Sequence, residues 1–376
     1  MRTMLLAATA ALALALPAAA QEETPSSSEA VGPTKTPAPA PSEIVAAAPK
    51  ADWVAIAAED LLVMTLAPDA EGKPRQVVIQ LMPAPFSQGW VHNIRLFARA
   101  KWYDNISVNR VQDNYVTQWG DPNYDNPEAT GKPKPLPEGL KVMTEADYVT
   151  STIDVTLAFN GYEITEENRA DFKDHDWSQT TDPAFHNQQQ DIKSTQTATT
   201  FAGWHQRDPY AEWVEFLLGW PIASEGESGD APWWPTHCYG MVGVGRNYSP
   251  DTGSGAELYT VIGHAPRHLD RNIALVGRVI EGMEHLSSLP RGSGALGFYT
   301  AEEAAKRTPI TSVRVANDLP MSEQPRFEYL STESATFAAY AEAIANRRDP
   351  FFIAPAGGAD ICNIRVPVRR VVVEGG

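Results

Sequence analysis

The sequence predicts a mainly β fold, because its clearest patterns are those of strands. Residues 76–82 (QVVIQLM) alternate and are rich in β-branched side chains, which is typical of a strand. The earlier run 61–66 is expected to pair with residues 77–81 across the turn 69–72 (DAEG). Residues 310–315 are predicted to form the last strand of the domain.

One amphipathic helix is predicted between the strands. Residues 87–100 repeat apolar side chains at helical spacing, and Ser87 stands at the position of an N-cap. The apolar face of this helix consists of Trp90, Val91, Ile94, Phe97 and Ala98. The predicted order is therefore strand, packed helix, and then a strand that carries an arginine at residues 108–111.

That arginine lies in the most informative segment of the chain, residues 101–122. The segment runs VNRV at 108–111, turns, and continues as YVTQWGD at 115–121. It resembles the active site of the cyclophilins, in which F-H-R-[VI] leads through a short turn to F-M-x-Q-G-G-D. The residues that match this motif are Arg110, Gln118, Gly120 and Asp121.

A second match lies far along the chain, at residues 240–282. Two independent segments in the right order are much harder to obtain by chance than one. This segment resembles the cyclophilin run G-x-[LV]-x-M-A-[NR], followed by G-S-Q-F-F-I, W/H-L-D and V-F-G-x-V-x-x-G. By that resemblance, the residues of the substrate groove are Gly245, Arg246, Gly255, Glu257, Tyr259, His268, Leu269 and Ile273.

The resemblance implies a cyclophilin-like fold, a closed eight-stranded antiparallel barrel capped by two helices. We expect this domain to occupy residues 51–320 and to be interrupted by a long insertion at about 123–236. The insertion has few periodic apolar runs, which favours an elaborated surface loop. Its tryptophans either pack it onto the barrel or form a groove for unfolded polypeptide. They are Trp177, Trp204, Trp213, Trp220, Trp233 and Trp234.

The resemblance also implies peptidyl-prolyl cis-trans isomerisation, and the chemistry explains the residue types. An X-Pro bond rotates over a barrier of roughly 18–20 kcal/mol, because resonance gives it partial double-bond character. A fixed guanidinium stabilises a charge distribution that exists fully only in the twisted bond. No nucleophile, metal or cofactor is needed. Arg110 is the expected catalytic residue and Gln118 the residue that orients it, rather than Arg110 being a surface residue in an ion pair.

The same resemblance assigns the contacts to the substrate. Gly245 and Arg246 are expected to offer backbone groups to the substrate chain. The residues expected to receive the proline ring are Tyr115, Val116, Tyr259 and Leu269.

Several positions depart from the family pattern. Val116, Tyr259 and Ile273 replace methionine, phenylalanine and histidine, and all three stay apolar enough to receive a proline ring. Glu257 replaces glutamine, so its carboxylate either competes with the substrate for the catalytic arginine or helps to hold the guanidinium. His268 replaces tryptophan, which implies weak cyclosporin binding.

Two other classes of function remain open from the sequence. A catalytically weak chaperone or peptide-binding protein of the same fold would keep the groove without turnover. Glu257 and the replacement of the usual methionine and histidine favour it, whereas Arg110 and Gln118 favour the enzyme.

A zinc hydrolase would use His264 and His268, which are four residues apart, with His237, His285 and nearby acidic residues. Pro266 lies between the first two and no HExxH motif is present, so the sequence gives this hypothesis little support.

The N-terminus predicts export. Arg2 precedes an apolar run and a small-residue cleavage site after Ala20, so residues 1–20 are the predicted signal peptide. Residues 21–50 are rich in Pro, Ala and Ser and are expected to form a flexible linker. Residues 321–376 are a C-terminal extension. We therefore expect an exported protein, either periplasmic or fully secreted, with no membrane span after signal cleavage.

The amino-acid composition limits which binding partners are expected. The formal net charge of −17 argues against nucleic acid and anionic membranes. The expected partners are proline-containing unfolded or exported polypeptides, bound by a monomer without a cofactor. The two cysteines, Cys238 and Cys362, either form one disulfide that ties the tail to the barrel or remain as buried thiols.

Overall fold

The computed structural model describes most of the chain after the N-terminal region. The described residues are 38–124, 126–151, 153, 208–226 and 230–371. The predicted signal peptide, the first part of the linker, and Trp177 and Trp204 lie outside them. None of the helices in the described ranges has the length and apolar character needed to cross a membrane.

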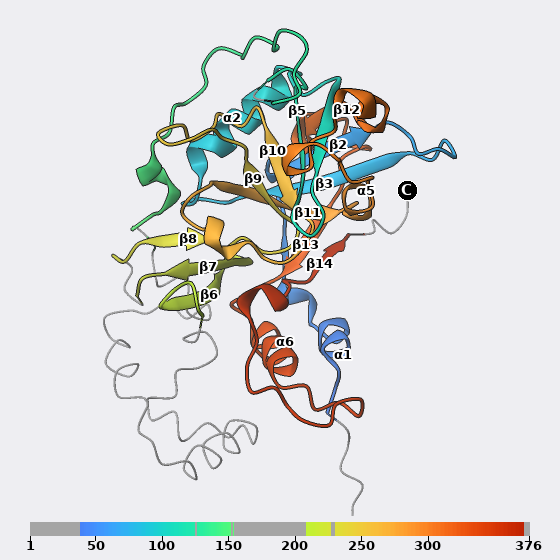
Figure 1. Ribbon diagram of the computed structural model, residues 1–376. Coiled ribbons are helices and arrows are strands. Elements are labelled where there is room, and N and C mark those ends of the chain that lie inside the picture. The colour runs from blue at the N-terminus through green and yellow to red at the C-terminus, as the bar shows by residue number, and fades with distance from the viewer. Residues whose placement is uncertain (1–37, 125, 152, 154–207, 227–229, 372–376) are drawn as a thin grey trace, which may run out of the picture. The chain divides into compact units, whose positions relative to one another are not determined.

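A closed antiparallel barrel of eight strands carries the fold (Figure 1). Around the barrel the strands follow the order β10-β5-β4-β12-β2-β3-β11-β9, and β9 pairs with β10 to close it. They are β2 (Leu61–Leu66), β3 (Arg75–Leu81), β4 (Ile106–Val111), β5 (Val116–Gly120), β9 (Met241–Val244), β10 (Leu258–Val261), β11 (Leu275–Glu281) and β12 (Pro309–Val315). The predicted fold class is confirmed.

The elements predicted from pattern lie where the sequence placed them. β2 pairs with β3 in the expected hairpin, with Leu61 opposite Gln80 and Leu66 opposite Arg75. β12 is the last strand of the barrel and pairs with β2 and β4. Helix α2 (Gln88–Arg99) begins after Ser87, which is the N-cap residue but makes no side-chain capping hydrogen bond.

Two helices pack against the barrel. α2 contacts β11 and β12, and the short helix α5 (Glu284–Ser287) contacts β3. The predicted apolar face of α2 is buried. The indole nitrogen of Trp90 donates to the backbone carbonyls of Thr252 and Gly253. α2 therefore holds the loop that leads into β10, which carries part of the candidate site.

The insertion contains a three-stranded antiparallel sheet that the sequence analysis did not predict. Its strands are β6 (Trp213–Leu217), β7 (Trp220–Ser224) and β8 (Trp233–Pro235), in that order. Leu218 and Gly219 both have positive φ, 50° and 82°, which suits the two-residue turn of a tight hairpin. The expectation of an irregular loop is wrong for this part. Its strands are buried on both faces, so they show no apolar and polar alternation.

The tryptophans of this sheet are buried. Trp213, Trp220 and Trp233 belong to the hydrophobic core of the barrel, and Trp234 belongs to a second cluster. None of the four is more than 9% exposed. For these four, packing is the interpretation that holds, and the hypothesis of an aromatic groove is wrong.

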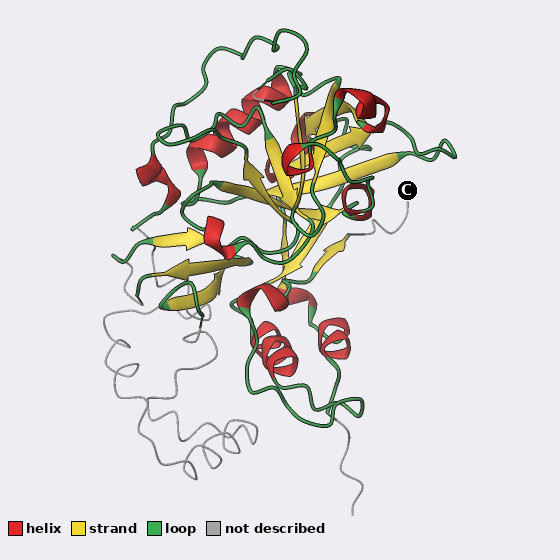
Figure 2. Ribbon diagram, viewed as in Figure 1, coloured by secondary structure: helices red, strands yellow, loops and turns green. Residues whose placement is uncertain are grey.

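The segment before the barrel and the chain after it fold together. β1 (Trp53–Ala55), β13 (Phe327–Leu330) and β14 (Val368–Arg370) form another three-stranded sheet. Helix α1 (Pro41–Ala46) contacts α6 (Ala335–Ala345), and Figure 2 shows these two helices beside each other. The expectation of a flexible linker is wrong from Pro41 onwards, because the apolar side chains of α1 find a partner in the tail.

A second hydrophobic core joins three parts of the chain. It contains Trp53 from β1, Phe216 and Trp234 from the insertion, and Phe337 and Tyr340 from α6. Aromatic contacts cross this core, since the rings of Phe216 and Phe337 meet edge to face at 5.0 Å. The N-terminal segment, the insertion and the tail thus form one packed unit, which we call the accessory unit.

Two further contacts join the accessory unit to the barrel. Cys238, just before β9, forms a disulfide with Cys362 in the tail. Arg278 of β11 donates to the backbone carbonyl of Gly219 at 2.7 Å and lies 4.4 Å from the centroid of the Trp220 ring. Burial lowers the pKa of Arg278 to about 10.

The disulfide is predicted to stabilise the folded chain strongly, because it closes a loop across a sequence separation of 124 residues. Replacing Cys238 and Cys362 together by serine should lower the free energy of unfolding by about 3–5 kcal/mol, measured by urea denaturation. Reductant should destabilise the parent to the same extent and leave the double variant unchanged. A parent protein that is insensitive to reductant after unfolding and refolding would contradict the prediction.

Candidate active site

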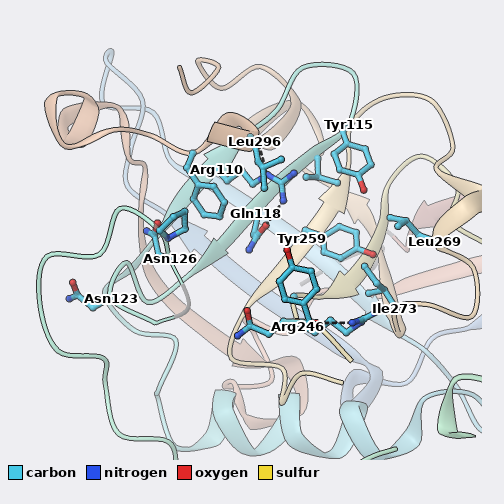
Figure 3. Close-up of a pocket in the computed structure, with 16 residues that line it drawn as sticks. Arg110, Tyr115, Gln118, Asn123, Asn126, Arg246, Tyr259, Leu269, Ile273 and Leu296 are labelled. Carbon is cyan, nitrogen blue, oxygen red and sulfur yellow. Dashed lines mark hydrogen bonds between the residues drawn. The ribbon is translucent and has the colours of Figure 1, made fainter. Parts of the chain in front are cut away.

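A cavity of about 620 Å³ opens at one side of the barrel (Figure 3). Strands β4, β5 and β10 contribute to it, together with the loop after β9 and other loops. Its lining consists of Arg110, Tyr115, Val116, Gln118, Asn123, Asn126, Pro127, Gly245, Arg246, Asn247, Tyr248, Tyr259, Leu269, Ile273, Leu296 and Phe298. The two sequence motifs, which are more than a hundred residues apart, therefore meet in one pocket.

Arg110 is held by three neutral acceptors. Its Nη1 donates to Oε1 of Gln118 at 3.1 Å, its Nη2 to Oε1 of Gln112, and its Nε to the backbone carbonyl of Leu296 at 2.7 Å. The first contact follows from the sheet, because Arg110 of β4 lies opposite Gln118 of β5. A guanidinium has five N–H groups, so two of those of Arg110 have no hydrogen-bond partner among the residues that the structure describes.

Two aromatic rings flank the same guanidinium. Its central carbon lies 5.6 Å from the centroid of the Tyr115 ring and 5.5 Å from that of Phe298. These cation–π contacts orient the planar group without neutralising it. Burial lowers the pKa of Arg110, while Tyr115, Glu257 and Tyr259 act in the opposite direction. An arginine remains charged at neutral pH even after such a shift.

Glu257 supports Arg110 through Gln118. The Nε2 of Gln118 donates to Oε2 of Glu257 at 2.5 Å, so the amide oxygen of Gln118 faces Arg110. Glu257 is 3% exposed. Two glycines make room for it, since a Cβ at Gly120 would lie 2.7 Å from its Oε1 and one at Gly245 2.9 Å from its Cβ. Of the two roles that the sequence left open for Glu257, this geometry matches the one that holds the arginine.

Tyr259 forms one wall of the pocket and is fixed from behind. Its hydroxyl lies 2.9 Å from Nε2 of His237, and Nδ1 of His237 lies 2.8 Å from Oδ1 of Asp270. A carboxylate accepts, so Nδ1 carries the proton in the neutral ring and Nε2 accepts from the tyrosine hydroxyl. Burial raises the pKa of Tyr259 well above its ordinary value, so the phenol stays neutral and able to donate.

The support of Tyr259 continues into the insertion. Oδ2 of Asp270 accepts from Nε of Arg267 at 2.5 Å, and Arg267 forms two hydrogen bonds with Asp208, at 2.7 Å and 3.0 Å. The side chains of Arg267, Asp208 and Asp270 are 1%, 3% and 5% exposed. We call the chain from Tyr259 through His237, Asp270 and Arg267 to Asp208 the buried relay.

The sequence matches a family model described as cyclophilin type peptidyl-prolyl cis-trans isomerase/CLD over residues 76–315. This range covers more than half of the 376 residues and includes both motifs. The chain belongs to the cyclophilin-type peptidyl-prolyl cis-trans isomerase family.

Solved structures agree with the cyclophilin fold. The chain is similar to the cyclophilin AquaCyp293 from Hirschia baltica, with a TM-score of 0.52 and 17% identity over 86% of this chain and 95% of that one. Two structures of a cyclophilin type isomerase from Cryptosporidium parvum, one in the presence of the dipeptide Ala-Pro, match with 10% identity. They cover 67% and 68% of this chain and 97% and 96% of theirs, with TM-scores of 0.31 and 0.32, which are too low to carry a structural comparison. A search of curated proteins found no match.

The structure brings most of the predicted cyclophilin site together. The predicted residues that line the pocket are Arg110, Tyr115, Val116, Gln118, Gly245, Arg246, Tyr259, Leu269 and Ile273. Glu257 lies behind Gln118 rather than in the lining, and Gly255 contacts α2 through Ile94 and Phe97 instead. His268 is exposed and is not part of the lining.

Several pocket residues escaped the sequence analysis. Leu296 and Phe298 come from the segment before β12, which carries no family motif, and β-bridge pairing of Phe298 with Arg110 brings them to the site. Asn123 and Asn126 follow β5 at the start of the insertion. The aromatic Phe298 in an otherwise Gly-rich stretch was the one available signal.

A zinc site receives no support from the residues that the structure describes. Among them, no group of three or more His, Cys, Asp or Glu side chains is arranged to hold a metal ion. Both ring nitrogens of His237 are engaged, one with Asp270 and the other with Tyr259.

Replacing Tyr259 by phenylalanine is predicted to destabilise the protein by about 1–3 kcal/mol, because the change leaves Nε2 of the buried His237 without its hydrogen bond. Urea denaturation measures this loss. Tyr248→Phe is the matched control, since Tyr248 lines the same pocket but is 93% exposed, and it should change stability by less than about 0.5 kcal/mol. Equal stability of Tyr259→Phe and the parent would show that the hydrogen bond contributes nothing.

Proposed function

We propose that this cyclophilin isomerises X-Pro bonds in exported polypeptides, with Arg110 as the catalytic residue. The observation that supports this proposal best is the setting of Arg110, a half-buried guanidinium with neutral hydrogen-bond acceptors and an open pocket beside it. An arginine in a structural ion pair would instead face a carboxylate.

The free N–H groups of Arg110 provide the chemistry. As the X-Pro bond twists, conjugation is lost, and electron density that the planar bond shares with the carbonyl oxygen returns to the prolyl nitrogen. A preorganised donor at that point stabilises the twisted bond more than either planar isomer. Gln118, Tyr115 and Phe298 keep the donor in place, so little reorganisation is needed during the reaction.

An apolar surface for the proline ring lies beside Arg110. Val116 and Tyr259 are 2% and 4% exposed and belong to one small hydrophobic cluster, against which Tyr115 and Ile273 pack. Tyr259 lies across Gly243 of β9, where an added Cβ would come within 2.3 Å of the tyrosine hydroxyl. The wall of the pocket therefore depends on a glycine in the neighbouring strand.

Two observations support export as the setting of this reaction. The N-terminal sequence has the pattern of a signal peptide, and the structure contains a disulfide between Cys238 and Cys362. Disulfides form and persist in oxidising compartments such as the bacterial periplasm. Periplasmic clients would be unfolded segments that contain proline.

An isomerisation assay with a short Ala-Pro-Phe peptide tests the proposal. The mature protein should accelerate the cis-to-trans step, and Arg110→Ala should lower kcat/KM by about two orders of magnitude or more, since it removes the charged donor. Arg110→Lys should also lose at least about tenfold, because an ammonium cannot reproduce the planar fork that contacts Gln118 and Gln112.

A matched control separates the role of Arg110 from the loss of one positive charge. Arg75→Ala, at the start of β3, removes an arginine that is not part of the pocket and should leave kcat/KM unchanged. Full activity of Arg110→Ala would refute its catalytic role. Peptide binding without any acceleration by the parent would favour the alternative function, a chaperone or peptide-binding protein with a cyclophilin fold.

A further inference from the structure

The pocket differs in charge from the rest of the chain. The protein carries a formal net charge of −17, with 47 acidic and 30 basic side chains. The lining of the pocket contains two arginines, Arg110 and Arg246, and no aspartate or glutamate. A concave site lined by one sign of charge attracts ligand groups of the opposite sign.

Arg246 is anchored so that its charge remains available. Arg246 lies two residues after the end of β9. Its Nε donates to the backbone carbonyl of Asn272 at 2.8 Å and its Nη1 to that of Asn247 at 2.7 Å. Both acceptors are neutral. Within the described part of the chain, its Nη2 has no hydrogen-bond partner and Arg246 has no ion pair with a carboxylate.

The nearest acidic residue in sequence is occupied elsewhere. Asp251 accepts from the backbone N–H of Asn247 at 2.9 Å through one oxygen and from that of Gly253 at 3.0 Å through the other. It thus holds the loop after Arg246 and forms no ion pair with it. Buried Glu257 is likewise engaged with Gln118.

Arg246 and Arg110 lie on opposite sides of the pocket. Figure 3 shows Arg110 on one side and Arg246 on the other, near Ile273, with Gln118 and Tyr259 between them. A proline seated against Tyr259 and Val116 beside Arg110 would place a neighbouring group of the same peptide close to Arg246. The side chain of Arg246 therefore faces a substrate group other than the bond that twists.

We propose that Arg246 determines substrate specificity, by favouring X-Pro segments with a carboxylate close to the proline. This inference rests on the proposed isomerase function and adds a substrate class to it. The carboxylate comes either from an aspartate or glutamate side chain or from a free C-terminus. Because Arg246 is partly exposed, the contact is an ordinary surface ion pair, and it adds selectivity without being required for isomerisation.

The test compares peptides that differ only in charge. The probes are N-acetylated, C-terminally amidated Xaa-Ala-Pro-Phe peptides with Glu, Gln or Lys at Xaa, so that no other carboxylate is present. An acetylated Ala-Ala-Pro-Phe peptide with a free C-terminus forms a separate arm. At low salt, we expect the parent to have a kcat/KM about fivefold higher for one of the two carboxylate peptides than for its neutral counterpart. The counterpart of the Glu peptide is the Gln peptide, and that of the peptide with a free C-terminus is the same peptide with an amidated C-terminus. The Lys peptide should be slower than the Gln peptide, and all differences should shrink as salt rises.

Two variants assign this preference to one residue. In Arg246→Gln, the ratio of kcat/KM between the charged and the neutral peptide should fall to about 1, and any change that is common to both peptides cancels in this ratio. Lys73→Gln, in the turn before β3, is the control for net charge, because Lys73 is outside the pocket, and it should retain the parent ratio.

The outcomes separate this inference from the proposed function. An equal rate for charged and neutral peptides in the parent would overturn the inference while leaving the isomerase intact. A preference that persists in Arg246→Gln would assign it to another group and overturn it as well. If no peptide is isomerised, the proposed function fails, and the ratio of peptide dissociation constants, measured by NMR titration, tests Arg246 by the same criteria.

Discussion

The site depends on one constraint, that Arg110 must be buried enough to be preorganised yet remain unpaired with a carboxylate. A carboxylate in direct contact would satisfy the guanidinium, and a substrate carbonyl would have to displace it. The chain places the negative charge one side chain further away. Glu257 binds Gln118, and Gln118 presents its neutral oxygen to Arg110. The arginine is thereby fixed in orientation, and its remaining N–H groups stay directed at the pocket.

The buried relay follows from a rule about buried polar groups. A phenylalanine at position 259, as is usual in cyclophilins, needs no partner. The hydroxyl of Tyr259 does need a hydrogen-bond partner, because a buried donor or acceptor without a hydrogen bond is costly. Each buried partner in turn needs a partner of its own. His237 satisfies the tyrosine, Asp270 the histidine, and Arg267 the aspartate. The sequence of requirements ends at Asp208, which belongs to the insertion and accepts hydrogen bonds from Nη1 and Nη2 of Arg267.

The resemblance to the cyclophilins implied the barrel and much of the site, while short-range patterns predicted individual elements. The pairing of β2 with β3, the face of α2 and the pairing of Arg110 with Gln118 follow from alternation, helical spacing and motif order. The accessory unit was not predictable in the same way. Its strands are short and buried on both faces, and α1 has a buried side only because α6, nearly three hundred residues later, packs against it. Asp208 and Leu296 were missed for the same reason, since only tertiary contact brings them to the site.

The accessory unit is bonded to the two segments whose side chains hold Tyr259 in the wall of the pocket. Cys238 is bonded to the tail, and the residue before it, His237, is the one that holds Tyr259. The segment that carries the histidine is thus tied to the tail by the disulfide, while Asp208 ties the turn that carries Asp270 and Arg267 to the insertion. The ring of Tyr259 packs on Gly243, and its hydroxyl is bound to His237 at the far end. An insertion and a tail that look like appendages in the sequence therefore support the side chains that hold Tyr259 in the wall of the pocket.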